Sequence, residues 1–292
     1  MTARFLFPLL LSILAAAPAA GEAPACPGLA PVGQVAAHGG DRAWLADPRD
    51  SYRHGVFGEP AEPGVLVLQG PAAQARGMDC LVAVLPEDRV FEDREVRFWD
   101  ADGDGTAELA VVETDLEGGA RLALYGTADG ELRRLAQGPA LGFHRWLSPV
   151  GPVPWGRGGA PLLAVVTTPH IGGVLRLYRY TPGSADLTEA AQLPGWSTHR
   201  FGSALPNTAL VDAVPGGTNW IVAPDQARRR IARLRWQDGA WSIEEVGETE
   251  AQVSGAIAVA PDGCAYRVPT DTGIVQFPRP GAPGGCPQDK SR

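Results

Sequence analysis

Lysine is almost missing from this chain of 292 residues: Lys290 is the only one, so nearly all of the positive charge is arginine. With 25 Lys and Arg against 33 Asp and Glu, the formal net charge is −8. A net acidic chain repels the phosphate backbone of nucleic acids. The composition therefore argues against general nucleic-acid binding.

Long apolar runs are missing beyond the N-terminus. The apolar run at the N-terminus itself, from Phe5 to Ala17, is too short to span a bilayer. It follows Arg4 and ends in the small-residue stretch Ala17-Pro18-Ala19-Ala20-Gly21, which is the layout of a secretory signal. We therefore expect residues 1–21 to be a signal peptide and residues 22–292 to form a soluble, exported chain, periplasmic or secreted, without a membrane span.

Cysteines are few, but their number is even. In an exported chain this indicates disulfides, with three pairings open. We expect Cys26 and Cys286 to join the two ends, which leaves Cys80 with Cys264. Local pairing, such as Cys264 with Cys286, is the alternative. A lipid anchor on Cys26 is a further alternative, disfavoured because Cys26 lies far from the apolar core of the signal.

Recognisable catalytic motifs are absent as well. The sequence has no His-Glu-x-x-His segment, no Gly-x-Ser-x-Gly elbow and no phosphate-cradling glycine loop. Its five histidines are scattered, with no pair at metal-ligand spacing. We therefore name no catalytic residue.

What the sequence does contain is an acidic stretch at residues 100–108, Asp-Ala-Asp-Gly-Asp-Gly-Thr-Ala-Glu. Its carboxylates repel one another unless a hard cation neutralises them, and Ca²⁺ takes 6–8 oxygen ligands in irregular geometry. Gly105 suits a sharp turn around the ion. A solvated acidic turn that binds nothing is the alternative. We predict one calcium site. Asp100, Asp102 and Asp104 supply side-chain oxygens, Thr106 supplies its backbone carbonyl, and Glu108 supplies a carboxylate that binds directly or through water.

The flanks of this stretch predict strands. A helix-loop-helix calcium motif starting at Asp100 needs a glutamate at its twelfth position, which is Val111 here. Residues 96–99 alternate between two faces, and residues 108–113 form a short apolar, partly β-branched run. The acidic loop is therefore expected to join two strands.

Repetition sets the fold prediction. The run Leu-Ala-Val-Val at 109–112 recurs at 163–166 and, more loosely, at 220–223. Each run precedes a second apolar segment (121–125, 174–178, 231–236) and a third (131–136, 187–193, 241–246). With 37 Gly and 27 Pro, short strands joined by turns are favoured over long helices. We predict an all-β fold, a single β-propeller domain of about five four-stranded blades, with a Pro/Gly-rich tail from about residue 278.

Partial units flank the three repeats. Residues 65–68 and 81–84 are expected to be the inner strands of one unit, and residues 256–259, 265–268 and 274–277 belong to another. This last unit lacks a strand, which residues 32–36 are expected to supply, closing the ring. A β-sandwich is the main alternative. Two units share a His-Arg lead-in, at His144 and His199, which indicates repeated packing residues or a shared ligand-binding rim.

The sequence resembles the FG-GAP/VCBS repeat proteins, exported β-propellers related to the integrin α-subunit head. The resemblance rests on Asp100-x-Asp102-x-Asp104-Gly105-x-x-Glu108-Leu109-x-Val111 and the strand start Gly119-Ala120-Arg121-Leu122. Residues 52–58 and 144–151 also resemble a bacterial group of such proteins, and together these motifs and repeats cover half of the mature chain. In the family the acidic loop binds calcium between the first two strands of a blade. The next unit has no acid at 151–159, so one site is implied.

These observations lead to a functional expectation. We expect an exported, calcium-binding, monomeric β-propeller that acts as a binding or interaction module for a protein or glycan ligand. The alternative is a calcium-assisted hydrolase of phosphate esters or polysaccharide, which requires clustered acidic residues from several blades.

Overall fold

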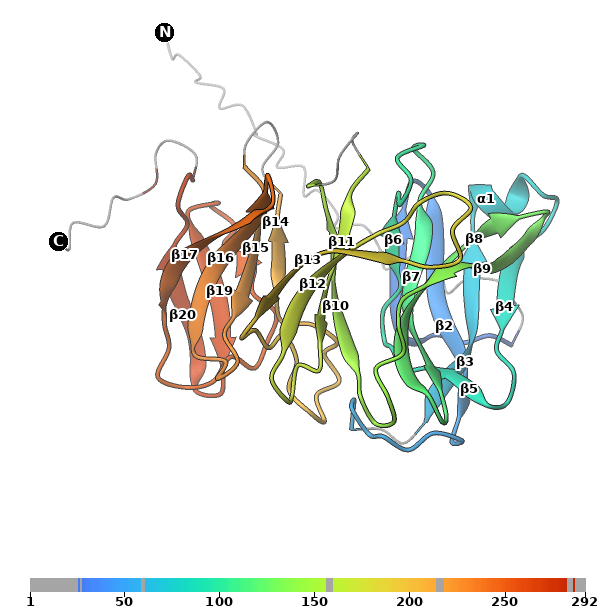
Figure 1. The fold of residues 1–292 in the computed structure, drawn as a ribbon, viewed down its shortest axis with the longest axis horizontal. Helices are drawn as coiled ribbons and strands as arrows, with labels where there is room; N and C mark the ends of the chain where they lie inside the picture. The colour runs from blue at the N-terminus through green and yellow to red at the C-terminus, as the bar shows by residue number, and fades with distance from the viewer. Residues whose placement is uncertain are drawn as a thin grey trace, which may run out of the picture.

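The computed structural model describes residues 26, 28–58, 61–155, 160–213, 218–282 and 286. The expected signal peptide lies outside the described residues. Five antiparallel sheets follow one another in chain order (Figure 1). We call them blades 1 to 5.

Each blade is an antiparallel meander in which consecutive strands pair, except that β5 and β6 of blade 2 both pair with β7. Blade 1 has β1 (Val32–His38), β2 (Asp41–Arg49), β3 (Glu62–Gln69) and β4 (Cys80–Val84), with the short helix α1 (Pro71–Gln74) before β4. Blade 2 has β5 (Arg89–Phe91), β6 (Arg97–Trp99), β7 (Glu108–Asp115), β8 (Gly119–Ala128) and β9 (Glu131–Gln137). Blade 3 has β10 (Leu147–Val153), β11 (Leu162–Thr167), β12 (Val174–Arg179) and β13 (Thr188–Pro194). Blade 4 has β14 (Leu210–Asp212), β15 (Trp220–Pro224), β16 (Arg230–Gln237) and β17 (Ala240–Glu248). Blade 5 has β18 (Ala258–Val259), β19 (Ala265–Thr270) and β20 (Gly273–Pro278).

The inner strands of blades 1 to 4, β1, β6, β10 and β14, lie side by side. β1 contacts β6, β6 contacts β10, and β10 contacts β14. All four strands line one central cavity of about 490 Å³. Successive meanders whose first strands share an axis define a β-propeller. The predicted all-β propeller of about five blades is confirmed.

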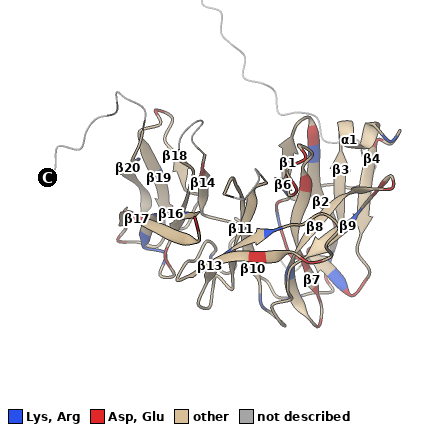
Figure 2. Ribbon diagram, turned by 45° about the horizontal axis from the view of Figure 1, so that its top comes forward, with Lys and Arg blue, Asp and Glu red and all other residues tan. Residues whose placement is uncertain are grey.

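The sequence repeats correspond to equivalent strands. The three apolar runs lie in β7, β11 and β15, the second strand of blades 2, 3 and 4, and every residue in them is buried. A strand covered on both faces needs no polar alternation, which is why these runs are continuous. Most of the ribbon is accordingly free of charge, with acidic and basic segments interspersed (Figure 2).

The predicted ring closure is wrong. β1 pairs with β2 through a tight turn at Gly39 and Gly40, whose φ values of 58° and 91° suit glycine. Because this hairpin is local, β1 belongs to blade 1, and blade 5 has three strands among the described residues. Residues 65–68 and 81–84, predicted to be inner strands, lie in β3 and β4, the third and fourth strands of blade 1. The strands β1 and β2 come before them in the blade.

The expected disulfide between Cys26 and Cys286 is also wrong. Cys26 bonds Cys80, and Cys264 bonds Cys286. Cys26 is buried against Trp44 and Val67 of blade 1, so it lies beside Cys80 at the start of β4. The local alternative therefore holds for Cys264 and Cys286. No helix in the described part of the chain has the length and apolar character needed to cross a membrane.

The first strand of blade 2 is interrupted. β5 and β6 both pair with β7, and Glu92, Asp93 and Arg94 between them are buried. The Asp93 carboxylate takes the place of the missing hydrogen bond between strands. Its Oδ2 accepts hydrogen bonds from Val112 N at 2.9 Å and from Arg97 Nη1 at 2.5 Å. Arg94 reaches blade 1, where its Nη1 lies 2.5 Å from Glu62 Oε2. The buried Arg94–Glu62 hydrogen bond thus joins blades 1 and 2.

Candidate functional site

The acidic stretch forms the loop between β6 and β7. These strands pair antiparallel, with Trp99 opposite Glu108. The loop therefore joins two neighbouring strands of one blade, at the upper end of the molecule in Figure 1. The prediction of a strand-flanked loop is confirmed.

The loop folds back on itself through its carboxylates. The Asp100 carboxylate accepts hydrogen bonds from Gly103 N at 2.9 Å and from Gly105 N at 3.2 Å. Asp102 accepts Asp104 N at 3.1 Å, and Asp104 accepts Thr106 N at 2.7 Å. Each aspartate holds a backbone amide further along the loop, so the chain wraps around the three side chains.

Gly105 occupies the turn at which the sequence predicted it. Its φ is 89°, and Gly103 has a φ of 79°, a region that other residues avoid. These two turns bring one carboxylate oxygen each from Asp100, Asp102 and Asp104 to within 4.8 Å of one another. Such a cluster of anionic oxygens suits a hard divalent cation.

Thr106 and Glu108 stand apart from this triplet. Thr106 is exposed, and its amide is held by Asp104. Glu108 Oε2 accepts Ala101 N at 2.9 Å, which closes the base of the loop. Burial raises the pKa of Glu108 to about 7. The hydrogen bond from Ala101 N opposes this rise, and the negative charges on Asp102 and Asp104 add to it. Of the five predicted ligands, the structure brings the three aspartates together and gives Glu108 a loop-closing role.

A cavity of about 440 Å³ adjoins the loop. Asp104 to Leu109 line one wall, and His38, Arg76, Phe98 and Tyr125 line others. The cavity lies between blades 1 and 2, since α1 and the β1–β2 turn form part of its edge. Its volume falls within the usual range for a small-molecule site.

Sequence reasoning missed a second cluster, at the opposite end of the molecule. The connections that carry His54, His144, His170 and His199 all lie at the end away from the acidic loop, because strand direction alternates through each meander. His54 stacks on His144, and His170 contacts His199. The one sequence signal for this was the matching lead-in at His144 and His199.

The fold and this geometry define a five-bladed β-propeller with one acidic interstrand loop. No protein-family model matches the chain, and no curated protein matches it. The FG-GAP/VCBS resemblance thus stays a prediction.

Among 47 matching chains of solved structures is a proposed 6-phosphogluconolactonase of Bacteroides fragilis, with a TM-score of 0.42 and 14% identity. The match covers 84% of this chain and 65% of that chain, so this protein spans less than two thirds of the length of its neighbour. Similarity at this level carries no argument about activity.

Proposed function

We propose that this protein is a calcium-binding β-propeller that acts as an exported binding module. The observation that carries the proposal is the convergence of three aspartate oxygens within 4.8 Å in a loop between paired strands. Ca²⁺ would be held by Asp100, Asp102 and Asp104, with the Thr106 carbonyl and Glu108 as further oxygen donors. The ion neutralises the loop and stiffens one wall of the adjoining cavity.

The cavity beside the loop is the proposed ligand site. It combines a cation (Arg76), acidic groups and two aromatic rings (Phe98 and Tyr125). Such a mixture suits a polar ligand with an apolar face, as a glycan or a protein side chain presents. The two disulfides fit an exported chain.

Isothermal titration with CaCl₂ tests the metal site. We expect one Ca²⁺ per chain for the wild type and none for Asp102→Ala. Asp129→Ala is the matched control, because Asp129 lies in the β8–β9 turn of the same blade and pairs only with Arg133 there, at 3.1 Å. Absence of calcium binding by the wild type contradicts the proposal.

Ligand binding is tested on a glycan array and by capture from the exported fraction, in calcium and in chelator. We expect a retained ligand that is lost in chelator and in Asp102→Ala. The hydrolase alternative requires acidic groups from several blades, and among the described residues the aspartate triplet is the one group of three suited to a metal. Turnover of phosphate esters or glycans by the pure protein would favour that alternative instead.

A further inference from the structure

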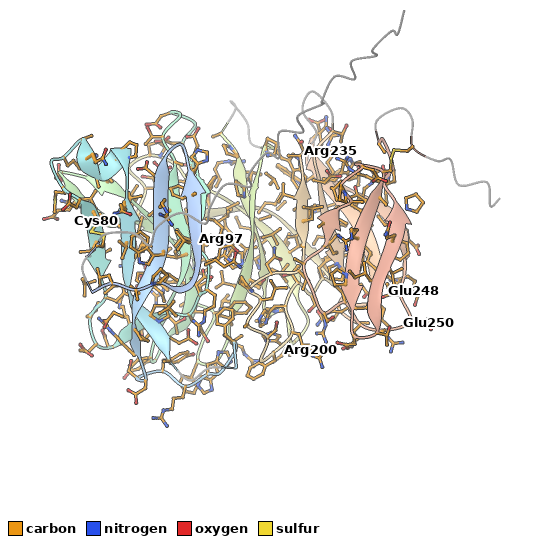
Figure 3. The ribbon with its side chains drawn as sticks, turned by 180° about the vertical axis from the view of Figure 1, so that it is seen from behind. Cys80, Arg97, Arg200, Arg235, Glu248 and Glu250 are labelled. Atoms are coloured by element: carbon orange, nitrogen blue, oxygen red, sulfur yellow. A yellow bond between two sulfur atoms is a disulfide. The ribbon has the colours of Figure 1, made fainter. Side chains whose placement is uncertain are left out.

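A second surface cavity, of about 550 Å³, lies between blades 3 and 4. Pro154 and Trp155, which follow β10, line one side of it, and residues 235–239, at the end of β16 and in the β16–β17 turn, line the other. Arg235 is labelled at the upper end of the molecule in Figure 3. This cavity is larger than the one beside the acidic loop and shares no lining residue with it. We call it the tryptophan pocket, after Trp155 and Trp236.

A third tryptophan fixes the two sides of the pocket relative to each other. Trp241 lies opposite Trp236 in the antiparallel β16–β17 pair, so both rings are on the same face of blade 4. The Trp241 ring meets Trp155 edge-on, with centroids 6.3 Å apart. Its indole N–H donates to Gln192 O of β13 at 3.0 Å. Trp241 therefore joins blade 4 to blade 3 and holds the pocket open in one shape.

Packing between blades does not account for these rings completely. Trp155, Trp236 and Trp241 contact the hydrophobic core between blades 3 and 4, yet all three are only partly buried. Trp99 and Trp146, which pack inside the molecule, are 0% and 1% exposed. Part of each indole surface thus remains open to solvent beside a cavity, an arrangement that suits a ligand with an apolar face.

Polar groups complete the lining. Arg235, Gln237 and Asp238 border the rings, and Gln237 and Asp238 are exposed. Asp238 and Gly239 form a two-residue hairpin turn with φ values of 52° and 82°, which matches the tight turn that follows the twist of the strands. The turn places planar amide, guanidinium and carboxylate groups, which offer both donors and acceptors, next to the rings.

We propose that the tryptophan pocket binds a pyranose ring of a neutral oligosaccharide, packed on Trp236 with its hydroxyl groups near Gln237 and Asp238. A pyranose has an apolar face of C–H groups and a rim of hydroxyl groups, so it matches an indole bordered by polar side chains. Arg235 and Asp238 carry opposite charges, which favours an uncharged ligand over an anion or a cation.

Calcium has no part in this site, because no residue of the acidic loop lines it. The inference therefore goes beyond the calcium-dependent ligand site proposed above. A sugar that stays bound in chelator reports the tryptophan pocket, and a ligand that is lost in chelator reports the cavity beside the acidic loop. The two proposals can fail separately.

Titration of the full chain in EDTA with cellohexaose, xylohexaose, laminarihexaose, maltohexaose and chitohexaose is the test, followed by calorimetry and tryptophan fluorescence. We expect at least one of these sugars to bind one per chain and to change the fluorescence. Trp236→Leu should weaken its binding at least about tenfold, and Trp236→Phe should stay within about threefold of the wild type. Both replacements are apolar, so a role in packing alone predicts equal binding by the two variants.

Further variants keep the test decisive. Gln237→Ala, at an exposed position, leaves the core intact and should weaken binding about threefold even if Trp236→Leu fails to fold. Phe143→Leu is the matched control, because Phe143 is 60% exposed in the β9–β10 connection at the opposite end, and it should bind like the wild type, as should Asp102→Ala. Binding of none of the five sugars, loss of binding in EDTA, or undiminished binding by folded Trp236→Leu overturns the proposal.

Discussion

The acidic loop and the histidine end, the end of the molecule whose connections carry His54, His144, His170 and His199, assemble their side chains in different ways. At the acidic loop every carboxylate comes from residues 100–108, and the chain needs only two glycine turns to bring three of them together. At the histidine end the rings come from four connections that are up to 145 residues apart, from His54 to His199. A local site can form before its blade packs, whereas the histidine end exists only when the blades are in place.

Charge separates the two ends as well. The aspartates of the acidic loop lie near the surface and accept hydrogen bonds from backbone amides, an arrangement of oxygens that suits the calcium ion proposed above. His170 and His199 pack on Trp146, Phe57 and Phe201, and burial lowers the pKa of both rings. The same scaffold therefore presents an ionic site and a nearly uncharged one.

The largest loss of stability is expected from replacing the buried tryptophan that packs at each of the two ends. Trp99 and Trp146 are 0% and 1% exposed, and their indole N–H groups bond Pro161 O and Glu92 O at 2.9 and 2.8 Å. Replacement of either by Ala should lower the free energy of unfolding by about 3–5 kcal/mol in urea titrations. Trp241→Ala, at a partly exposed site, is the control.

The comparison predicts different binding defects for these two variants. Trp99→Ala should weaken calcium binding in titration calorimetry, and Trp146→Ala, at the opposite end of the molecule, should spare it. If both variants lost calcium binding equally, the two ends would be coupled through the blades, and the distinction between them would be wrong.

Calcium should act on the acidic loop alone. At a hundred times its dissociation constant, a ligand stabilises the folded state by about 2.7 kcal/mol, which corresponds to roughly 5–10 °C in melting temperature for a chain of this size. We expect that shift between calcium and chelator for the wild type, measured by scanning calorimetry, and none for Asp102→Ala. An equal shift in both proteins would place the calcium elsewhere.

Acid should act through the histidine end. His199 has a pKa near 3 in the folded chain because of burial, against an ordinary 6.5. Below pH 6.5 the unfolded chain takes up a proton that the folded chain does not, so stability falls as the pH falls toward 3. Between pH 7 and pH 5 this costs about 2 kcal/mol.

His199→Asn isolates this contribution in metal-free buffer. Glu62, whose pKa burial raises to about 8 against the pull of Arg94, gives the opposite slope in the same window. Because Glu62 is present in both proteins, its contribution cancels in the difference between them. We expect a shallower loss of stability with acid for His199→Asn in urea titrations at pH 5, 6 and 7; parallel curves would show that His199 does not titrate as its burial implies.

The smallest effect is expected at the loop glycine. Gly105→Ala places a side chain at a φ of 89° and should cost about 1 kcal/mol. Gly130→Ala, in the β8–β9 turn at a φ of 84°, should cost the same, since a Cβ meets nothing within 4 Å at either position. Only Gly105→Ala should reduce calcium affinity in titration calorimetry. Equal affinities for the two variants would mean that the turn does not position the aspartates.

Much of the fold could be predicted because the blades repeat. The strands β7, β11 and β15 could be located from their continuous apolar runs, because a central strand is buried on both faces. β2 escaped notice because Asp47 and Pro48 interrupt its apolar pattern, and Asp47 has a positive φ of 61°. Missing β2 led directly to the wrong assignment of β1 to the last blade.

The disulfides and the buried charges could not be predicted for a related reason. Cys26 pairs with Cys80 because its segment packs on blade 1, where the Trp44 indole bonds Leu29 O at 2.9 Å. Glu92, Asp93 and Arg94 are all charged, yet they are buried, and Arg94 bonds Glu62 of blade 1. Neither contact has a local sequence signal.

Residue order alone settled the features that depend on neighbours in the chain: the strand runs, the glycine turns and the spacing of Asp100, Asp102 and Asp104. Their physical cause is short range, in backbone conformation and charge repulsion within one loop. The histidine end, the central cavity and the partner of Cys26 were decided by how the blades pack, because only the folded sheets bring these distant groups into contact.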